Sequence, residues 1–140
     1  MPGVTVDSSV WVAAADPTDS FCAPSRAFFA GLFRHGSRIH VPAFARVEVA
    51  CALARRQRDA PAARRLTHAM LSGGQVAEVA MDAPLLVRAQ GAGTAAFLRG
   101  ADSLFVATAQ ATGATLVSWD NELLRRGGAV TPSDWAAANP

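Results

Sequence analysis

Short apolar runs alternate along the chain with longer stretches whose apolar residues recur at helical spacing. The runs at 4–6, 37–42, 75–81 and 114–119 predict strands, and 128–132 predicts a further edge strand. Helical spacing and boundary residues predict helices at 8–15, 25–36, 43–59, 60–74, 82–93, 102–112 and 121–128. Strands alternating with helices favour an α/β fold, in which a central parallel sheet of four to five strands lies between two helical layers.

The predicted helix 43–59 carries apolar residues at Phe44, Val47, Cys51 and Ala54. That spacing predicts one buried face, with Cys51 as a small core residue. Glu48 lies beside this face, where a core helix normally has an apolar residue. Glu48 is therefore a candidate functional residue.

The composition fits a single globular domain over residues 1–140. Hydrophobic residues make up 51% of the chain and charged residues 17%, which argues against disorder. All 13 basic residues are arginine, a composition better explained by coding bias than by selection for phosphate binding. The N-terminal segment lacks the pattern of a signal peptide, and the longest uncharged run is too polar to span a membrane. We expect a cytoplasmic location.

Four of the eleven acidic residues stand at matching places in the predicted topology. Asp7 and Asp120 follow the first and fourth strands, Glu48 lies early in the helix after the second strand, and Asp102 opens the helix that leads into the fourth strand. Strand ends and the helix starts that follow them meet at one edge of a parallel α/β sheet, so all four can converge there. Helix capping is the simpler explanation for each aspartate alone, but it does not explain Glu48.

Clustered carboxylates repel one another unless a cation lies between them. Oxygen ligands without histidine or cysteine suit Mg²⁺ or Mn²⁺ better than Zn²⁺. The sequence therefore predicts a divalent-metal site at this edge of the sheet.

Four segments, "VDSSVW", "ARVEVACAL", "RGADSLFVATAQ" and "LVSWDNELL", resemble in order and spacing the PIN domain, in the branch of the bacterial VapC toxin ribonucleases. The resemblance runs from residue 4 to about 132. It implies an RNA-cleaving hydrolase that uses Mg²⁺, with Mn²⁺ as a possible substitute. The acids that match the family's catalytic and metal-binding set are Asp7, Glu48, Asp102 and Asp120.

The same resemblance assigns supporting roles to two hydroxyls, Ser9 and Ser118, which orient metal ligands or waters. Among the basic residues, Arg46 and Arg99 are nearest the predicted site and are candidates for RNA phosphate contacts. The arginine-rich segment 55–65 is better explained as a solvated helix face, with binding to RNA or an acidic partner as the less favoured explanation.

The toxin branch also implies a homodimer and a VapB-type antitoxin as partner. A guanidinium is the natural protein ligand of an acidic cluster, so we expect the antitoxin to insert an arginine among the four acids. The rest of the antitoxin is expected in an apolar groove around Trp11, Phe28 and Phe44.

Three other functions are compatible with acidic residues at the end of a sheet, and two of them require residues that this chain does not have. A receiver domain needs a lysine in its acidic pocket, and the chain contains none. A phosphatase of the haloacid dehalogenase type needs Asp-x-Asp after the first strand, where this chain has Asp7-Ser8-Ser9. A PIN-like module that binds RNA or a partner without cutting it remains as the alternative function.

Overall fold

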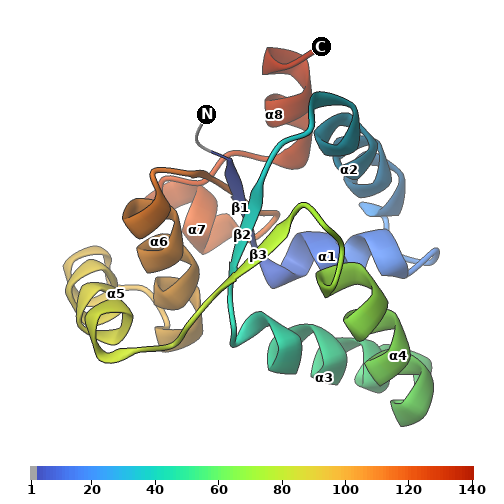
Figure 1. Cartoon of the computed structure of the whole chain (residues 1–140), viewed down its shortest axis with the longest axis horizontal. Helices are drawn as coiled ribbons and strands as arrows, with labels where there is room; N and C mark the ends of the chain where they lie inside the picture. Colours follow the sequence, from blue (N-terminus) through green and yellow to red (C-terminus); the bar gives the residue numbers. More distant parts are fainter. Residues whose placement is uncertain (1–2) are drawn as a thin grey trace.

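The computed structural model describes residues 3–140 and has the predicted α/β architecture (Figure 1). Its sheet consists of β1 (Val4–Val6), β2 (Ile39–Pro42), β3 (Val76–Val79) and β4 (Thr115–Val117). All strand pairs are parallel, in the order β3-β2-β1-β4. The expected edge strand at 128–132 is reduced to one parallel bridge between Val117 and Val130.

Helices cover the sheet on both sides, which gives the predicted three layers. In Figure 1, α5 and α6 lie on one side of the sheet, and α1 to α4 lie on the other. The bounds are α1 Ser8–Ala15, α2 Cys22–His35, α3 Ala45–Gln57, α4 Ala60–Leu71, α5 Ala83–Ala96, α6 Gly100–Thr112, α7 Asn121–Arg126 and α8 Pro132–Ala138.

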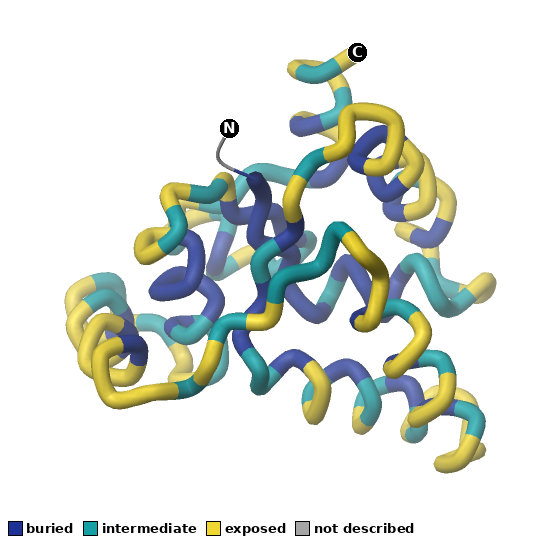
Figure 2. Tube along the Cα trace, in the orientation of Figure 1, coloured by how far each residue is buried: buried dark blue, intermediate teal, exposed yellow. Residues whose placement is uncertain are grey.

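The core lies where the two helical layers meet the central strands. All three residues of β1 are buried, and Phe28 of α2 and Phe105 of α6 are fully buried. In Figure 2 the central strands are dark blue, whereas α4 and α5 expose much of their outer surface. A strand covered on both faces reads as a continuous apolar run, which is why β1 and β4 were recognisable in the sequence.

The buried face of α3 differs from the predicted one. Ala45, Val49 and Leu53 are fully buried, whereas Val47 and Cys51 are exposed. The predictions of a Val47–Cys51 core face and of Cys51 as a core residue were therefore wrong. The helix is apolar nearly all round, so periodicity alone could not choose its inward face.

Helix α8 was not predicted, although its start carries strong local signals. The hydroxyl of Thr131 accepts a hydrogen bond from Asp134 N at 3.0 Å, and Pro132 occupies the first turn. Trp135 of α8 packs edge-on against Phe28 of α2, with ring centroids 5.3 Å apart. This contact anchors the end of the chain to the core.

The glycine-rich segment before Asp102 is helical and forms the end of α5. At Gly93 a β-carbon would lie 2.7 Å from Ser103 Cβ, so the glycine lets α5 approach α6 closely. This packing holds the first turn of α6, which carries Asp102, at the edge of the sheet.

Within residues 3–140, no helix combines the length and apolar character needed to cross a membrane.

Candidate active site

The four predicted acids come together at the carboxyl edge of the sheet. Asp7 follows β1 and Asp120 lies just beyond β4, while Glu48 and Asp102 lie in the first turns of α3 and α6. All four line one open cleft of about 370 Å³, here called the acidic cleft. The topology thus brings together residues separated by up to 113 positions, as the strand-end argument predicted.

Asp7 is the most buried of these acids, at 4% exposure. Its Oδ2 accepts hydrogen bonds from Ser9 Oγ at 2.7 Å and Ser118 Oγ at 2.8 Å. Burial raises the pKa of Asp7 above its ordinary value, although both hydroxyls act in the opposite direction. The hydrogen bonds from Ser9 and Ser118 all go to Oδ2 of Asp7.

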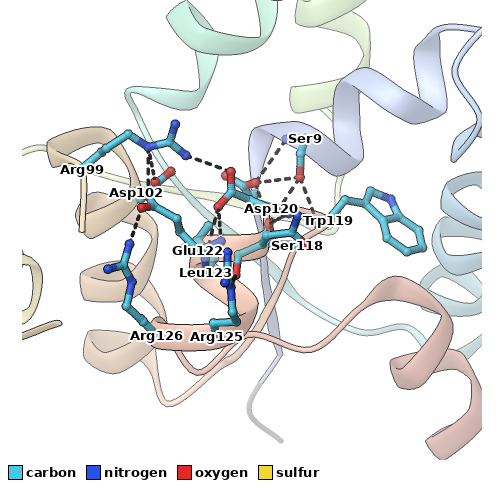
Figure 3. A network of polar contacts seen from close by, with 12 residues as sticks. Ser9, Arg99, Asp102, Ser118, Trp119, Asp120, Glu122, Leu123, Arg125 and Arg126 are labelled. Carbon is cyan, nitrogen blue, oxygen red and sulfur yellow. Dashed lines mark hydrogen bonds and ion pairs between the residues drawn. The ribbon is translucent and has the colours of Figure 1, made fainter. Parts of the chain in front are cut away.

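The two serines tie Asp7 to the chain around Asp120. Ser9 Oγ accepts a hydrogen bond from Trp119 N at 3.1 Å, and Ser118 Oγ accepts one from Asp120 N at 2.9 Å. Figure 3 shows both serines beside Trp119 and Asp120. The expected positions of Ser9 and Ser118 next to the acids are therefore observed, while their roles toward a metal stay predictions.

Glu48 is half-buried and makes no ion pair within the described part of the chain, residues 3–140. Burial raises its pKa, and the nearby charges of Asp7 and Asp102 raise it further. Asp7 and Glu48 are called the inner acids below. Both carry a charge that the metal-free protein does not neutralise with a salt bridge.

A second group lies nearer the solvent and is called the outer acids: Asp102, Asp120 and Glu122. One carboxylate oxygen from each lies within 4.8 Å of the other two, a spacing that a single cation can bridge. Glu122 was not among the predicted site residues. Its place two residues after a helix-capping aspartate was the only sequence signal for it.

Arg99 partly neutralises the outer acids. Its Nε lies 3.0 Å from Asp102 Oδ2 and 3.2 Å from Glu122 Oε2, and its Nη2 lies 2.9 Å from Asp120 Oδ2. Figure 3 shows the guanidinium reaching from Asp102 toward Asp120, with Arg126 as a further partner of Glu122. Burial raises the pKa of Asp102, and Arg99 partly offsets this shift.

Helix capping explains only part of this arrangement. Asp7 caps α1, and Asp120 Oδ1 caps α7 by accepting hydrogen bonds from Glu122 N and Leu123 N. Asp102 caps nothing, because Arg99 is the N-cap residue of α6. Asp7 and Asp120 therefore both cap a helix and line the cleft, whereas capping explains neither Glu48 nor Asp102.

The donor set fits a divalent cation of the magnesium type. Every acidic group around the cleft offers carboxylate oxygen, and no histidine or cysteine lines the cleft in residues 3–140. Burial is the main cause of the raised pKa values of Asp7, Glu48 and Asp102, and neighbouring carboxylates add to it at Glu48 and Asp102; a bound cation would favour the charged forms.

The arginines lie partly elsewhere than predicted. Arg46 pairs with Glu78 of β3 and does not line the acidic cleft, whereas Arg99 does. Arg55 and Arg56 also line the cleft, so the part of α3 expected to be a solvated face borders the site. Both side chains are exposed, as expected of a solvated face, and the structure adds that this face borders the acidic cleft.

The predicted antitoxin groove was wrong in two of its three residues. Trp11 is 4% exposed and Phe28 is fully buried, so neither can line a surface groove. Both belong to the hydrophobic core, where aromatic residues contribute most by packing.

A family model described as the PIN domain matches residues 4–129. A search of curated protein sequences gave no match. Among solved structures, the chain is similar to VapC20 of Mycobacterium tuberculosis, described as a sarcin-ricin loop cleaving toxin, with a TM-score of 0.76 and 17% identity over 91% of this chain and 97% of that one.

Two further structures share the fold. PAE2754 from Pyrobaculum aerophilum has a TM-score of 0.71 and 24% identity, covering 97% of this chain and 88% of that one. A chain of a toxin–antitoxin complex from Klebsiella pneumoniae has a TM-score of 0.71 and 15% identity, covering 93% of this chain and 98% of that one.

Proposed function

Because the chain belongs to the PIN domain family, we propose that it is a metal-dependent endoribonuclease and the toxin of a VapBC-type toxin–antitoxin pair, acting in the cytoplasm. The observation that carries this proposal is the acidic cleft, where all four family acids meet and two serine hydroxyls hold Asp7. The fold shared with VapC20 and with the Klebsiella complex supports the toxin assignment.

The residues that would hold the ion, Mg²⁺ or Mn²⁺ in its place, are Asp7, Glu48, Asp102 and Asp120, with Glu122 as a further candidate. A divalent ion bound there supplies Lewis acidity: it makes water more acidic and stabilises negative charge on phosphate. Asp7 and Asp102 are proposed as direct ligands, and Glu48 as a ligand either directly or through water. Asp120 is proposed to complete a second ion's site.

The protein's own contribution is to fix the carboxylates before substrate arrives. Ser9 and Ser118 hold Asp7 Oδ2, which fixes the orientation of this carboxylate in the lining of the cleft. Backbone N–H groups at the start of α7 hold Asp120 Oδ1, which leaves Oδ2 for a cation. Such preorganisation lowers the cost of ordering several carboxylates around one cation.

Arginines around the cleft are proposed to bind the RNA backbone. Arg99 is 64% exposed at its side chain, so it can exchange the outer acids for a phosphate at low cost. Arg55 also lines the cleft, whereas the guanidinium of Arg56 is engaged by Asp16 and Asp19. The contact first expected from Arg46 has weaker support, because Arg46 is paired with Glu78 outside the cleft.

The antitoxin is proposed to place an arginine among the outer acids, and the toxin to work as a homodimer. Arg99 supports the first point, since its guanidinium already fits between Asp102 and Asp120 with distances of 3.0 and 2.9 Å. The dimer follows from resemblance to the toxin branch.

The test is cleavage of single-stranded RNA by purified protein, with the ends of the products mapped. Mg²⁺ or Mn²⁺ should support cleavage and EDTA should abolish it, while added metal should restore it. Undiminished cleavage in EDTA would contradict the metal-dependent mechanism. RNA binding without cleavage under any metal would favour the non-catalytic alternative.

A further inference from the structure

A partly exposed aromatic pair stands next to the acidic cleft. Phe21, just before α2, stacks on Trp119, with ring centroids 4.2 Å apart and planes inclined by 12°. Phe21 is 44% exposed, while Trp119 is partly buried and packs against the core. Trp119 directly precedes Asp120, so the stacked rings lie one residue from an acid of the site.

Hydrogen bonds hold both rings in place. Trp119 Nε1 donates to Ser25 Oγ at 2.8 Å, and the backbone N–H of Trp119 donates to Ser9 Oγ at 3.1 Å. Asp19 Oδ1 accepts from Phe21 N at 2.8 Å. Because Ser9 also binds Asp7, one hydroxyl fixes the aromatic pair and the most buried acid relative to each other.

The pair borders a cavity of about 380 Å³ that adjoins the acidic cleft. Its walls include Phe21, Trp119 and Asp19, and it shares Ser9, Arg56 and Asp120 with the cleft. A ligand in this cavity therefore lies beside whatever occupies the acidic cleft.

The charge of the cavity favours a neutral planar group. Arg56 Nη1 lies 2.9 Å from Asp16 Oδ2 and 2.7 Å from Asp19 Oδ2, so these charges largely cancel. A phosphate placed here would meet Asp19 and Asp120, while its nearest cation is already engaged. A nucleobase has no charge, and every base has a face that can stack on an aromatic ring.

We propose that Phe21 and Trp119 form a subsite for one nucleobase of the substrate, next to the scissile phosphate. The base stacks on the exposed side of the pair while the phosphate lies over the acids. The subsite positions the strand for cleavage. This inference rests on RNA being the substrate, as proposed above.

The first test compares Phe21→Ala with Phe33→Ala, a control on α2 that is more exposed, at 61%, and lies outside the cavity. Substrates are a single-stranded RNA with a mapped cleavage site and versions abasic at each nucleotide flanking it. Phe21→Ala should lower kcat/KM about tenfold on the intact RNA, chiefly through KM, as loss of one stacked base does. Phe33→Ala should behave as the unsubstituted protein.

The abasic substrates identify the partner of Phe21. One of them should cost the unsubstituted protein about the same tenfold and cost Phe21→Ala nothing more, because the two changes remove one contact. The subsite is overturned if the loss from Phe21→Ala and the loss from the abasic nucleotide multiply at every position tested. It is also overturned if Phe21→Ala and Phe33→Ala are equally active. Neither outcome affects the nuclease proposal. If Phe21→Ala weakens only antitoxin binding, the pair is a protein contact and the subsite is overturned.

A second test uses fluorescence and needs no cleavage. Titrating the Asp7→Asn variant with the intact oligonucleotide should quench tryptophan emission, and Asp7→Asn/Trp119→Phe should lose most of that quenching. Equal quenching in both variants overturns the subsite. If the unsubstituted protein cuts no RNA but Trp119-dependent quenching occurs, the subsite stands and the nuclease function fails.

Discussion

The inner and outer acids keep carboxylates together by different means. Asp7 is buried and held by two neutral hydroxyls, and its pKa is raised by that burial. Asp102, Asp120 and Glu122 are only partly buried and share the guanidinium of Arg99. A neutral hydrogen-bond donor fixes geometry without cancelling charge, whereas an arginine cancels charge but competes with any other cation.

The two groups of acids should therefore respond differently to cations. The inner acids form a rigid, electrostatically unfavourable arrangement that a metal relieves. The outer acids form a partly neutralised, solvent-accessible arrangement that can exchange one cation for another. Replacing an inner acid should therefore stabilise the metal-free protein, whereas replacing an outer acid breaks an ion pair with Arg99 and should destabilise it.

The largest effect is expected from Asp7→Asn. Activity should fall at least about a hundredfold, since even groups that only orient metal ligands contribute 10- to 100-fold. The metal-free variant should be as stable as the unsubstituted protein or more so, because asparagine caps α1 while removing a buried charge. RNA cleavage and thermal unfolding in EDTA measure the two effects.

Asp82→Asn is the matched control, because Asp82 also caps a helix, accepting a hydrogen bond from Leu85 N, but lies outside the cleft. It should retain activity. Normal cleavage by Asp7→Asn would mean that Asp7 acts only as a helix cap.

Ser118→Ala should have the next largest effect. Loss of its hydroxyl removes one of the two hydroxyl hydrogen bonds to Asp7 Oδ2 and the acceptor of Asp120 N, so activity should fall by about tenfold. Unfolding free energy should fall by about 1–2 kcal/mol, as for a buried hydrogen bond. Thr67→Val, which removes a buried hydroxyl from α4, should reduce stability without reducing the activity of the folded protein.

Arg99→Gln tests the outer acids. Without the guanidinium, Mn²⁺ should bind the RNA-free protein about fivefold more tightly, a modest gain because exposed ion pairs are weak. RNA cleavage should become less efficient at low substrate concentration, since a phosphate contact is lost. Calorimetric titration with Mn²⁺ measures the first effect. Arg46→Gln, which breaks only the pair with Glu78, should leave the affinity unchanged.

The smallest effect is a pH dependence. Burial raises the pKa of Asp7, so its folded form holds the proton more tightly than the unfolded chain does. The resulting stability is fully present below the unfolded pKa, about 4, and is lost as pH rises through the folded pKa. In EDTA, the Tm advantage of Asp7→Asn should therefore grow from pH 4 toward neutrality. A difference that stays constant over this range would contradict a raised pKa at Asp7.

The topology was predictable because it depends on local patterns. Val4–Val6 and Thr115–Val117 are short runs of β-branched and apolar residues, Asp7 follows the first directly, and Asp120 lies three residues beyond the second. The order of elements then placed Asp7, Glu48, Asp102 and Asp120 at one edge.

Side-chain direction was less predictable. Helix α3 has apolar residues on every side, so its inward face, and with it Arg55 and Arg56, depended on packing against the rest of the fold. Glu122 and the Arg99 contacts were missed for another reason, because they depend on how α6 and α7 sit relative to each other. Phe21 and Trp119 meet across 98 positions of sequence, which no local pattern records.

Because β1 pairs with β4, the site can form only late in the synthesis of the chain. Ser118 and Asp120 are translated more than 110 residues after Asp7. Until β4 pairs with β1, Ser9 is the only serine among residues 3–140 whose hydroxyl can donate a hydrogen bond to Asp7. Contacts this distant in sequence form slowly and only once the intervening chain is available. A chain still growing on the ribosome therefore lacks the assembled cleft until β4 has emerged and paired with β1.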